Sequence, residues 1–142
     1  IGTGIEGYTN RFAFGKASNV VENTFTSDAN WSRSSDERLK TLDSKIENAL
    51  DKVQQINGYN FHWNDTAKSL VGGEVYSNDN QIGVSAQEIE LVLPEVVKDA
   101  PINEQNEGSD YKTVQYEKIV PLLIEAIKEL KTELDDLKSS NS

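Results

Sequence analysis

The sequence predicts an α+β fold: a small mixed domain of short strands and helices that ends in a long C-terminal helix and follows a β-rich segment. Two kinds of pattern support this prediction. Short stretches that alternate between apolar and polar residues indicate strands, and apolar residues with helical spacing over 46–56 and 116–138 indicate two helices. With 142 residues, of which 36% are hydrophobic, the chain can fill one modest core.

The net charge divides the chain near residue 34. Residues 1–34 carry three basic and three acidic groups, whereas 35–142 carry 11 basic and 21 acidic groups and therefore the whole formal charge of −10. Such a step in charge indicates two segments with different roles. The negative charge disfavours nucleic acid and anionic membrane surfaces as partners. No stretch approaches the roughly 18 apolar residues of a membrane span.

The first segment, 1–34, is rich in Gly, Asn, Ser and Thr, with short apolar stretches at 11–14 and 19–21. These stretches predict strands between turns, too few to close a sheet alone. The segment is therefore interpreted as the C-terminal end of a larger upstream β structure. The chain begins at Ile1 and contains no methionine, so we expect it to be part of a longer polypeptide.

The second segment, 35–142, opens with an amphipathic helix whose apolar residues are Ile46, Ala49, Leu50, Val53 and Ile56. Asp43 or Ser44 is its expected N-cap, and Gly58 follows its end. Tyr59, Phe61 and Trp63 then alternate with polar residues, which predicts a half-buried strand. Further along, the pattern predicts a hairpin at 70–76, extended pieces at 82–84, 95–98 and 111–116, and polar loops at 77–80 and 101–110. Ser85 is expected to cap a short helix, with Glu88 in the capping-box position, that stops before Pro94.

The last helix, 116–138, carries two and a half heptads of an a/d seam formed by Val120, Leu123, Ile127, Leu130, Leu134 and Leu137. Ile124 and Ala126 widen the apolar stripe in the first half only. We therefore expect the first half to pack on its own domain and the second half to offer the seam to a partner. The alternative is a helix folded back on its own sheet. The charged residues that flank the seam, Glu129, Glu133 and Lys138, are interpreted as a solvated face rather than a specificity code. Val and Ile at two of the a positions lean toward two strands, although so few heptads leave the number open.

The inventory of catalytic groups is small. The absence of cysteine excludes disulfides, zinc-thiolate sites and thiol nucleophiles, and His62 is the single histidine, on the polar phase of its strand. The stretch 78–80 lacks the pattern of a calcium loop, and no glycine-rich phosphate loop is present. No cofactor or metal is therefore expected.

One pattern with catalytic potential is Ser35 followed by Lys40. A neutral lysine can take the proton of a serine hydroxyl, but it must first lose its charge, which desolvation or nearby positive charge favours. Arg38 would help this, whereas Asp36 and Glu37 would oppose it. Five residues apart, two side chains meet only if the backbone kinks or if different subunits contribute them. The alternative interpretation is a polar connector that leads into the first helix.

Seven motifs in this order resemble the intramolecular chaperone of endosialidase family, also called peptidase S74. They are SDERLK at 35–40, IENALDKV at 46–53, GYNFHW at 58–63, GVSAQEIE at 83–90, LPEVV at 93–97, VQY at 114–116 and LLIEAIKEL at 122–130. The resemblance covers essentially all of 35–142.

The resemblance implies a domain at the C-terminus of a phage tail spike, tail fibre or neck appendage. Such domains assemble three chains through the C-terminal helix as a coiled coil, here with Leu123, Ile127, Leu130, Leu134 and Leu137 in the seam. They help the upstream β-rich fibre to fold, and then release themselves by cleavage, here between Ser34 and Ser35. Ser35 would be the nucleophile and Lys40 its general base. Residues 1–34 would be the end of the fibre and 35–142 the chaperone and autoprotease domain.

Several alternatives stay open at this stage. The domain could be a structural trimerisation or receptor-binding tip that remains attached to the fibre. The family's eukaryotic relatives are membrane-tethered transcription regulators, but no membrane span or basic segment supports that context here. We therefore expect a virion precursor made in the host cytoplasm, a homotrimer without nucleic-acid or membrane partners. The loops at 66–81 and 101–110 are either grips for the folding fibre or ordinary surface loops.

Overall fold

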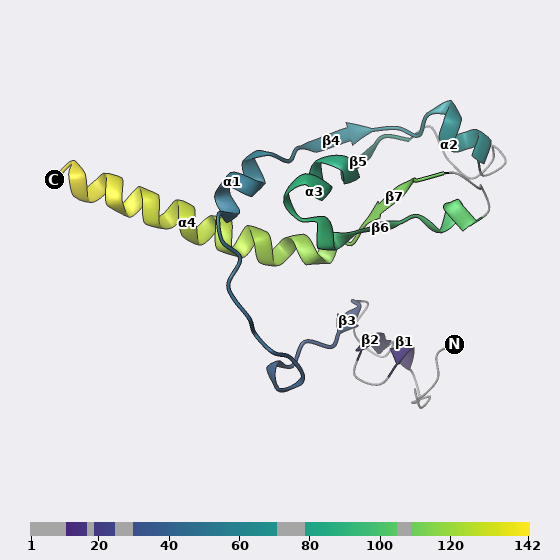
Figure 1. The fold of residues 1–142 in the computed structure, drawn as a ribbon, viewed down its shortest axis with the longest axis horizontal. Coiled ribbons are helices and arrows are strands. Elements are labelled where there is room, and N and C mark those ends of the chain that lie inside the picture. The colour runs from purple at the N-terminus through teal and green to yellow at the C-terminus, as the bar shows by residue number, and fades with distance from the viewer. Residues whose placement is uncertain (1–10, 17–18, 25–29, 71–78, 105–108) are drawn as a thin grey trace. The chain divides into compact units, whose positions relative to one another are not determined.

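The structure is a computed structural model that describes residues 11–16, 19–24, 30–70, 79–104 and 109–142 (Figure 1). The chain divides into two compact units, 1–44 and 45–142. This division falls downstream of the predicted domain boundary between Ser34 and Ser35. That boundary was placed by charge and by family resemblance, and it stays a prediction.

The first unit contains a three-stranded antiparallel sheet in the order β1-β2-β3. β1 (Arg11–Lys16) pairs along its length with β2 (Asn19–Thr24), and the short β3 (Ser32–Arg33) pairs with the other edge of β2. The strands predicted at 11–14 and 19–21 are thus confirmed. A single 3-10 turn, η1 (Glu37–Leu39), follows the sheet.

The second unit is a mixed α+β domain, as predicted. β4 (Gly58–Phe61) pairs antiparallel with β5 (Gln81–Val84), and β6 (Val97–Asp99) pairs antiparallel with β7 (Lys112–Val114). The helices are α1 (Ala49–Gln54), α2 (Asp65–Leu70), α3 (Ala86–Val92) and the long α4 (Ile119–Ser140). Three 3-10 turns complete it: η2 (Pro94–Val96), η3 (Pro101–Glu104) and η4 (Tyr116–Lys118).

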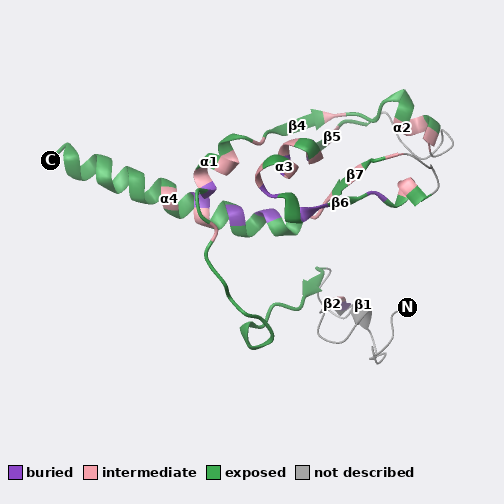
Figure 2. Cartoon of the chain, viewed as in Figure 1, coloured by how far each residue is buried: buried purple, intermediate pink, exposed green. Residues whose placement is uncertain are grey.

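The core of the second unit lies where α1, α3, β6 and the first half of α4 meet (Figure 2). Its buried members are Ala49, Ile89, Leu93, Val96, Val97, Ile119, Leu122 and Ala126. Ile46, Leu50, Val53 and Ile56 pack partly buried against this cluster. The apolar pattern of the first predicted helix therefore identified core residues correctly.

The start of α1 was predicted wrongly. The helix begins at Ala49, and neither Asp43 nor Ser44 caps it. Asn48 occupies the N-cap in the left-handed region with φ of 53°, a conformation that Asn tolerates better than most residues, and its side chain makes no capping bond. The acceptors for the first N–H groups come instead from α4, as described below.

Other local predictions fared unevenly. The extended piece at 82–84 is confirmed, and so is the short helix that Ser85 caps and that stops before Pro94. Residues 94–96 form a 3-10 turn, so only the end of the extended piece at 95–98 is a strand, and the strand at 111–116 shortens to 112–114. Helix α2 was not predicted. The hairpin at 70–76 lies almost wholly outside the described residues, with Leu70 in α2.

The strand at 59–64 is confirmed over Gly58–Phe61, but it is less buried than predicted. Tyr59 and Trp63 are exposed and only Phe61 is half-buried, with its ring edge-on to Trp63 at 5.3 Å between centroids. Phe61 and Tyr116 both press on Gly83 of β5. A Cβ at Gly83 would lie 2.8 Å from the Tyr116 hydroxyl and 3.0 Å from the Phe61 ring, so a larger residue would have to displace these side chains. The Tyr116 hydroxyl also accepts a bond from the Val84 N–H, which ties β5 to η4, the turn that precedes α4.

Candidate active site

Ser35 and Lys40 lie together in the first unit. Lys40 Nζ donates a hydrogen bond of 2.8 Å to Ser35 Oγ. The five-residue spacing requires a kink if both groups come from one chain, and η1 supplies it. The chain leaves Asp36 in an extended conformation, turns through Glu37–Leu39, and becomes extended again at Lys40, so that the two side chains meet.

The side chain of Asp36 shapes this turn. Its carboxylate accepts a hydrogen bond from the Arg38 N–H at 2.9 Å, which is the capping bond of η1. The same carboxylate pairs with the Arg38 guanidinium, with Nε at 3.0 Å from Oδ1. This pairing holds the pKa of Asp36 below its usual value and raises that of Arg38. The positive charge of Arg38 and the negative charge of Asp36 beside Lys40 therefore largely offset one another.

The residue before the proposed cleavage point is held by the sheet. Ser34 follows β3, and its N–H donates a hydrogen bond of 3.1 Å to the carbonyl of Val20 in β2. The Ser34–Ser35 peptide bond thus lies between the last hydrogen bond of the β2–β3 pairing and the turn that brings Lys40 to Ser35. Sheet and turn together position the two sides of this bond.

Residues 31–45 are all exposed in the single chain. None of the residues 35–40 is buried, so the turn alone offers no desolvation for Lys40. A lysine that acts as a base generally needs such desolvation or nearby positive charge. The single chain therefore supplies contact geometry but not a dry environment.

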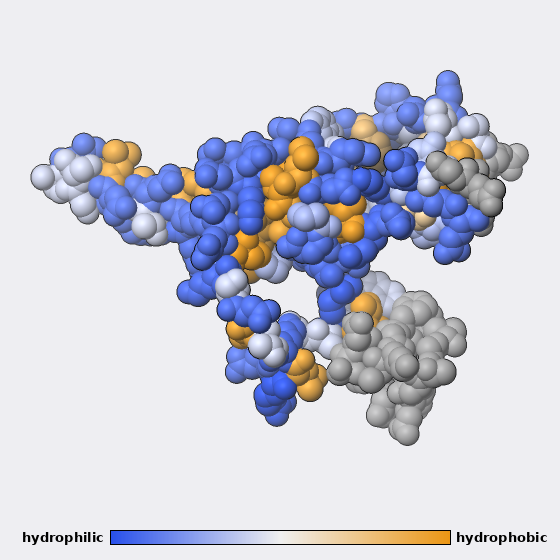
Figure 3. Space-filling model, viewed as in Figure 1, coloured by the Kyte–Doolittle hydropathy of each residue, from blue (hydrophilic) through white to orange (hydrophobic). Residues whose placement is uncertain are grey.

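The predicted seam residues lie exposed along α4. Leu123, Ile127, Leu130, Leu134 and Leu137 are all exposed, with Ile127 at 67% of its full accessible area, and Val120 and Ile124 are exposed as well. Apolar side chains reach the surface at several places along this helix in Figure 3. The first half of α4 does pack on its own domain, as predicted, but through Ile119, Leu122 and Ala126.

Glu129 is the residue that the sequence interpretation missed. It was predicted to belong to a solvated face, but its carboxylate accepts hydrogen bonds from the N–H groups of Ala49 at 2.9 Å and Leu50 at 2.7 Å. These bonds cap α1 from α4 and hold the pKa of Glu129 below its usual value. No local pattern could indicate this role, because the capped groups lie about 80 residues earlier in the chain.

Glu88 also accepts hydrogen bonds from residues that are distant in the sequence. The Ser85 hydroxyl accepts a bond from the Glu88 N–H at 3.5 Å, so Ser85 is the predicted cap of α3. The Glu88 carboxylate, however, accepts bonds from the Tyr59 hydroxyl at 2.6 Å and the Asn57 N–H at 2.9 Å. These contacts lower the pKa of Glu88 and tie α3 to the segment between α1 and β4.

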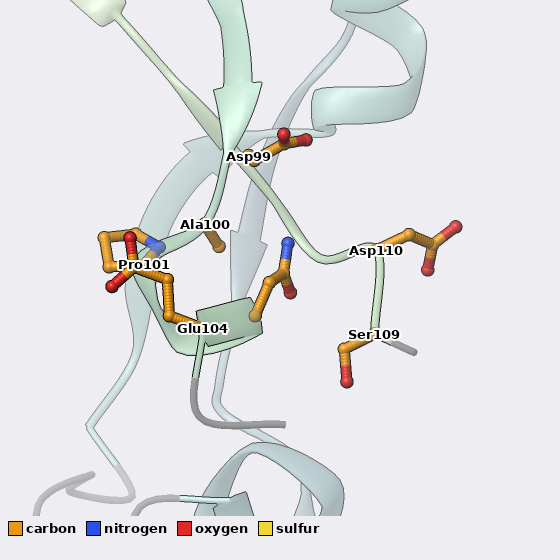
Figure 4. A pocket seen from close by; sticks show the side chains of 7 residues that line it. Asp99, Ala100, Pro101, Glu104, Ser109 and Asp110 are labelled. Atoms are coloured by element: carbon orange, nitrogen blue, oxygen red, sulfur yellow. The ribbon is translucent and has the colours of Figure 1, made fainter. Parts of the chain in front are cut away.

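A polar pocket lies beside the loop at 101–110 (Figure 4). Asn103 fixes the described part of this loop, since its amide donates to the Tyr111 carbonyl at 2.8 Å and accepts from the Tyr111 N–H at 3.0 Å. The carboxylates of Asp99, Glu104 and Asp110 line the pocket but point in different directions. Among the described residues, no group of three potential metal ligands converges, and no helix is both long enough and apolar enough to cross a membrane. His62 is exposed beyond β4.

Comparison with known proteins relates the chain to phage fibres. The family described as chaperone of endosialidase, peptidase S74, matches residues 35–98. The long tail fibre protein Gp37 of Enterobacteria phage K3 is 38% identical over 105 residues, which cover 74% of this chain and 8% of that protein. Gp37 of Enterobacteria phage M1 is 35% identical over 106 residues, which cover 74% of this chain and 39% of that protein.

A eukaryotic protein is also similar. The myelin gene regulatory factor-like A protein of Dictyostelium discoideum is 29% identical over 103 residues, or 70% of this chain and 11% of its own length. The chain spans well under two thirds of the length of each of these three relatives.

The mixed fold, the start of the match at Ser35 and the tail-fibre relatives together define a chaperone-type domain of a phage fibre. Over residues 35–98, the chain is similar to the chaperone of endosialidase family.

Proposed function

We propose that residues 35–142 form an intramolecular chaperone that trimerises, assists the folding of the upstream fibre and then releases itself by autoproteolysis between Ser34 and Ser35. Residues 1–34 are the C-terminal end of that fibre. The observation that carries the proposal is the hydrogen bond of 2.8 Å from Lys40 Nζ to Ser35 Oγ, at the first residue of the family match. The activity belongs to the tail or neck appendage of a virion and requires no cofactor.

The proposed reaction is an acyl shift followed by hydrolysis. Ser35 Oγ attacks the carbonyl carbon of Ser34 while neutral Lys40 takes the hydroxyl proton. The peptide C–N bond breaks, and Lys40 returns the proton to the departing amine of Ser35, which leaves Ser34 esterified to Ser35 Oγ. Water then cleaves the ester, giving the carboxylate of Ser34 and restoring the Ser35 hydroxyl.

The exposed seam of α4 supports the association of chains, and their number, three, is what the family resemblance implies. The five seam residues leave an apolar stripe uncovered on a strongly acidic chain, and burial of such surface drives association. Assembly also suits the chemistry, because residues 35–40 are exposed in one chain and a neighbouring chain can supply the desolvation that a lysine base needs. A spent chaperone piece of 108 residues would then leave the fibre.

The test is mass spectrometry of freshly purified protein before and after denaturation. We expect the wild-type chain to yield a piece that begins at Ser35, and Ser35→Ala to remain intact. Ser34→Ala is the matched control, since it removes a neighbouring hydroxyl and leaves the proposed nucleophile. Cleavage at the same bond in Ser35→Ala would refute the assignment.

Lys40 is tested by Lys40→Arg and Lys40→Ala. Arginine can still donate a hydrogen bond to Ser35 but stays protonated, so both variants should lose about a hundredfold or more in cleavage rate if Lys40 is a base. A rate in Lys40→Arg close to that of the wild type would show that the contact is structural.

The alternative function is a trimeric tip that stays attached. The exposed seam favours association of chains without requiring cleavage, so this alternative shares that observation. It predicts an intact chain of trimer mass in native conditions and of full-length monomer mass after denaturation. The loop at 101–110, beside the polar pocket, remains a candidate grip for the fibre under either function.

A further inference from the structure

The turn between Ser35 and Lys40 contains a side chain that the proposed reaction does not use. Asp36 accepts three kinds of hydrogen bond from one residue: from the Arg38 N–H at 2.9 Å, from Arg38 Nε at 3.0 Å and from Arg38 Nη2. A carboxylate that receives both a backbone N–H and a guanidinium fixes the backbone two residues ahead.

Packing does not hold this turn. All residues from Asp36 to Lys40 are exposed, and η1 contains no buried residue. The backbone contributes two bonds across the turn, from the Leu39 N–H to the Asp36 carbonyl and from the Lys40 N–H to the Glu37 carbonyl, each of 3.1 Å. Short exposed turns lose such bonds readily to water. The side chain of Asp36 is therefore the main additional constraint that brings Lys40 back toward Ser35.

The charge of Asp36 by itself works against the chemistry. The carboxylate lies close enough to Lys40 for the ammonium to contribute to its lowered pKa, after the larger effect of Arg38. A bare carboxylate there would favour the charged lysine. The Arg38 guanidinium offsets that charge, so the capping bond can be retained at little electrostatic cost to a lysine base.

We propose that Asp36 is a positioning residue for self-cleavage: its side chain caps the turn that holds Lys40 Nζ against Ser35 Oγ. This inference rests on the proposed function. Asp36 acts through the backbone of Arg38 and takes no proton from the reacting atoms. What the cleavage needs at this position is an acceptor oxygen, and the negative charge is dispensable.

Two substitutions of Asp36 distinguish its role as a hydrogen-bond acceptor from the role of its negative charge. Asp36→Ala removes both, and a lost cap of ordinary strength should slow cleavage of the full chain about tenfold. Asp36→Asn keeps an oxygen that can accept from the Arg38 N–H, so its rate should stay within about threefold of the wild type. Glu37→Ala is the matched control, because it removes the adjacent exposed carboxylate, which lies outside the contacts of Asp36.

The rates are followed by mass spectrometry of the accumulating piece that begins at Ser35. The inference is overturned if Asp36→Ala cleaves at the wild-type rate, or if Asp36→Asn is as slow as Asp36→Ala, which would assign the role to charge. A wild-type chain that stays intact refutes the proposed function and this inference with it. A wild-type chain that cleaves together with an unimpaired Asp36→Ala refutes the inference alone.

A second measurement addresses the turn directly. In the Ser35→Ala chain, which should stay intact, amide hydrogen exchange of Arg38 reports the capping bond. We expect added Asp36→Ala to speed this exchange and added Asp36→Asn to leave it nearly unchanged. Equal exchange in all three chains would contradict the capping role.

Discussion

Two faces of α4 carry apolar residues that differ in burial. One face presents Ile119, Leu122 and Ala126 to the core of its own chain, and all three are buried. The other presents the seam that begins at Val120, one position later along the chain, and is exposed from end to end. A shift of one residue rotates the position by about 100° around a helix, so the two faces are neighbours without overlapping. The folding of one chain and the association of several chains therefore depend on different residues of a single helix.

The largest effect should come from truncating the buried face. Leu122 is fully buried, so Leu122→Ala should lower the free energy of unfolding by about 2–5 kcal/mol through lost burial and a cavity. Leu123→Ala is the matched control on the seam and should leave the unfolding of a dilute, unassociated chain nearly unchanged. Denaturant unfolding monitored by circular dichroism measures both. If the two variants were equally destabilised in the dilute chain, the distinction between the faces would fail.

A smaller effect is expected on the seam. Leu134→Ala removes about three buried carbon groups from an assembled seam, which corresponds to about 2 kcal/mol per chain. The native mass should shift from trimer toward smaller species at a given concentration, while the helical content of each folded chain is retained. Thr132→Ala, whose hydroxyl bonds to the Lys128 carbonyl on the same helix, is the control. A trimer that is unaffected by Leu134→Ala would place the interface elsewhere.

The comparison of the two faces also separates what the sequence could predict from what it could not. The helical spacing over 116–138 predicted α4 and its partial packing on the domain, because these depend on periodicity alone. The seam residues are exposed, and their contact with a partner stays a prediction. Of the two residues that widen the apolar stripe in the first half, Ala126 lies in the core as expected, whereas Ile124 is exposed. The cap of α1 could not be found locally, since Glu129 reaches it through the tertiary fold.

The geometry of the turn at Ser35 and Lys40 could be predicted from the sequence in part. The spacing showed that the two side chains meet only through a kink or through a second chain, and the structure has the kink at η1. An Asp that precedes an Arg by two residues is a local signal for the capping bond. In the sequence, Asp36 was considered only for its negative charge, which Arg38 largely offsets. The desolvation of Lys40 is not encoded locally, because it depends on what covers an exposed turn.

The next effect concerns Glu129, which lies next to the seam residue Leu130 yet bonds to its own chain. Glu129→Gln keeps one acceptor oxygen but leaves one of the two N–H groups of α1 without it, and the melting temperature should fall by a few degrees. Glu133→Gln, one turn further along the same helix and exposed, is the control and should change little. Equal melting temperatures for the two variants would mean that the cap from α4 does not contribute to stability.

The smallest effect is the pH dependence that this cap produces. Bonds to the N–H groups of Leu50 and Ala49 hold the pKa of Glu129 below its usual value in the folded chain. A carboxyl with a lowered folded pKa contributes stability above its unfolded pKa of about 4.3, and this contribution is lost as the pH falls through the folded value. Glu129→Gln removes the titrating group. Its melting temperature should therefore fall less steeply than that of the wild type between about pH 5 and pH 3. Glu88, whose pKa is lowered by Tyr59 and Asn57, still titrates in this variant, so some slope should remain. Because Leu123→Ala leaves both carboxylates in place, it should keep the wild-type slope. Parallel curves for Glu129→Gln and the wild type would mean that the charge of Glu129 adds nothing to the cap.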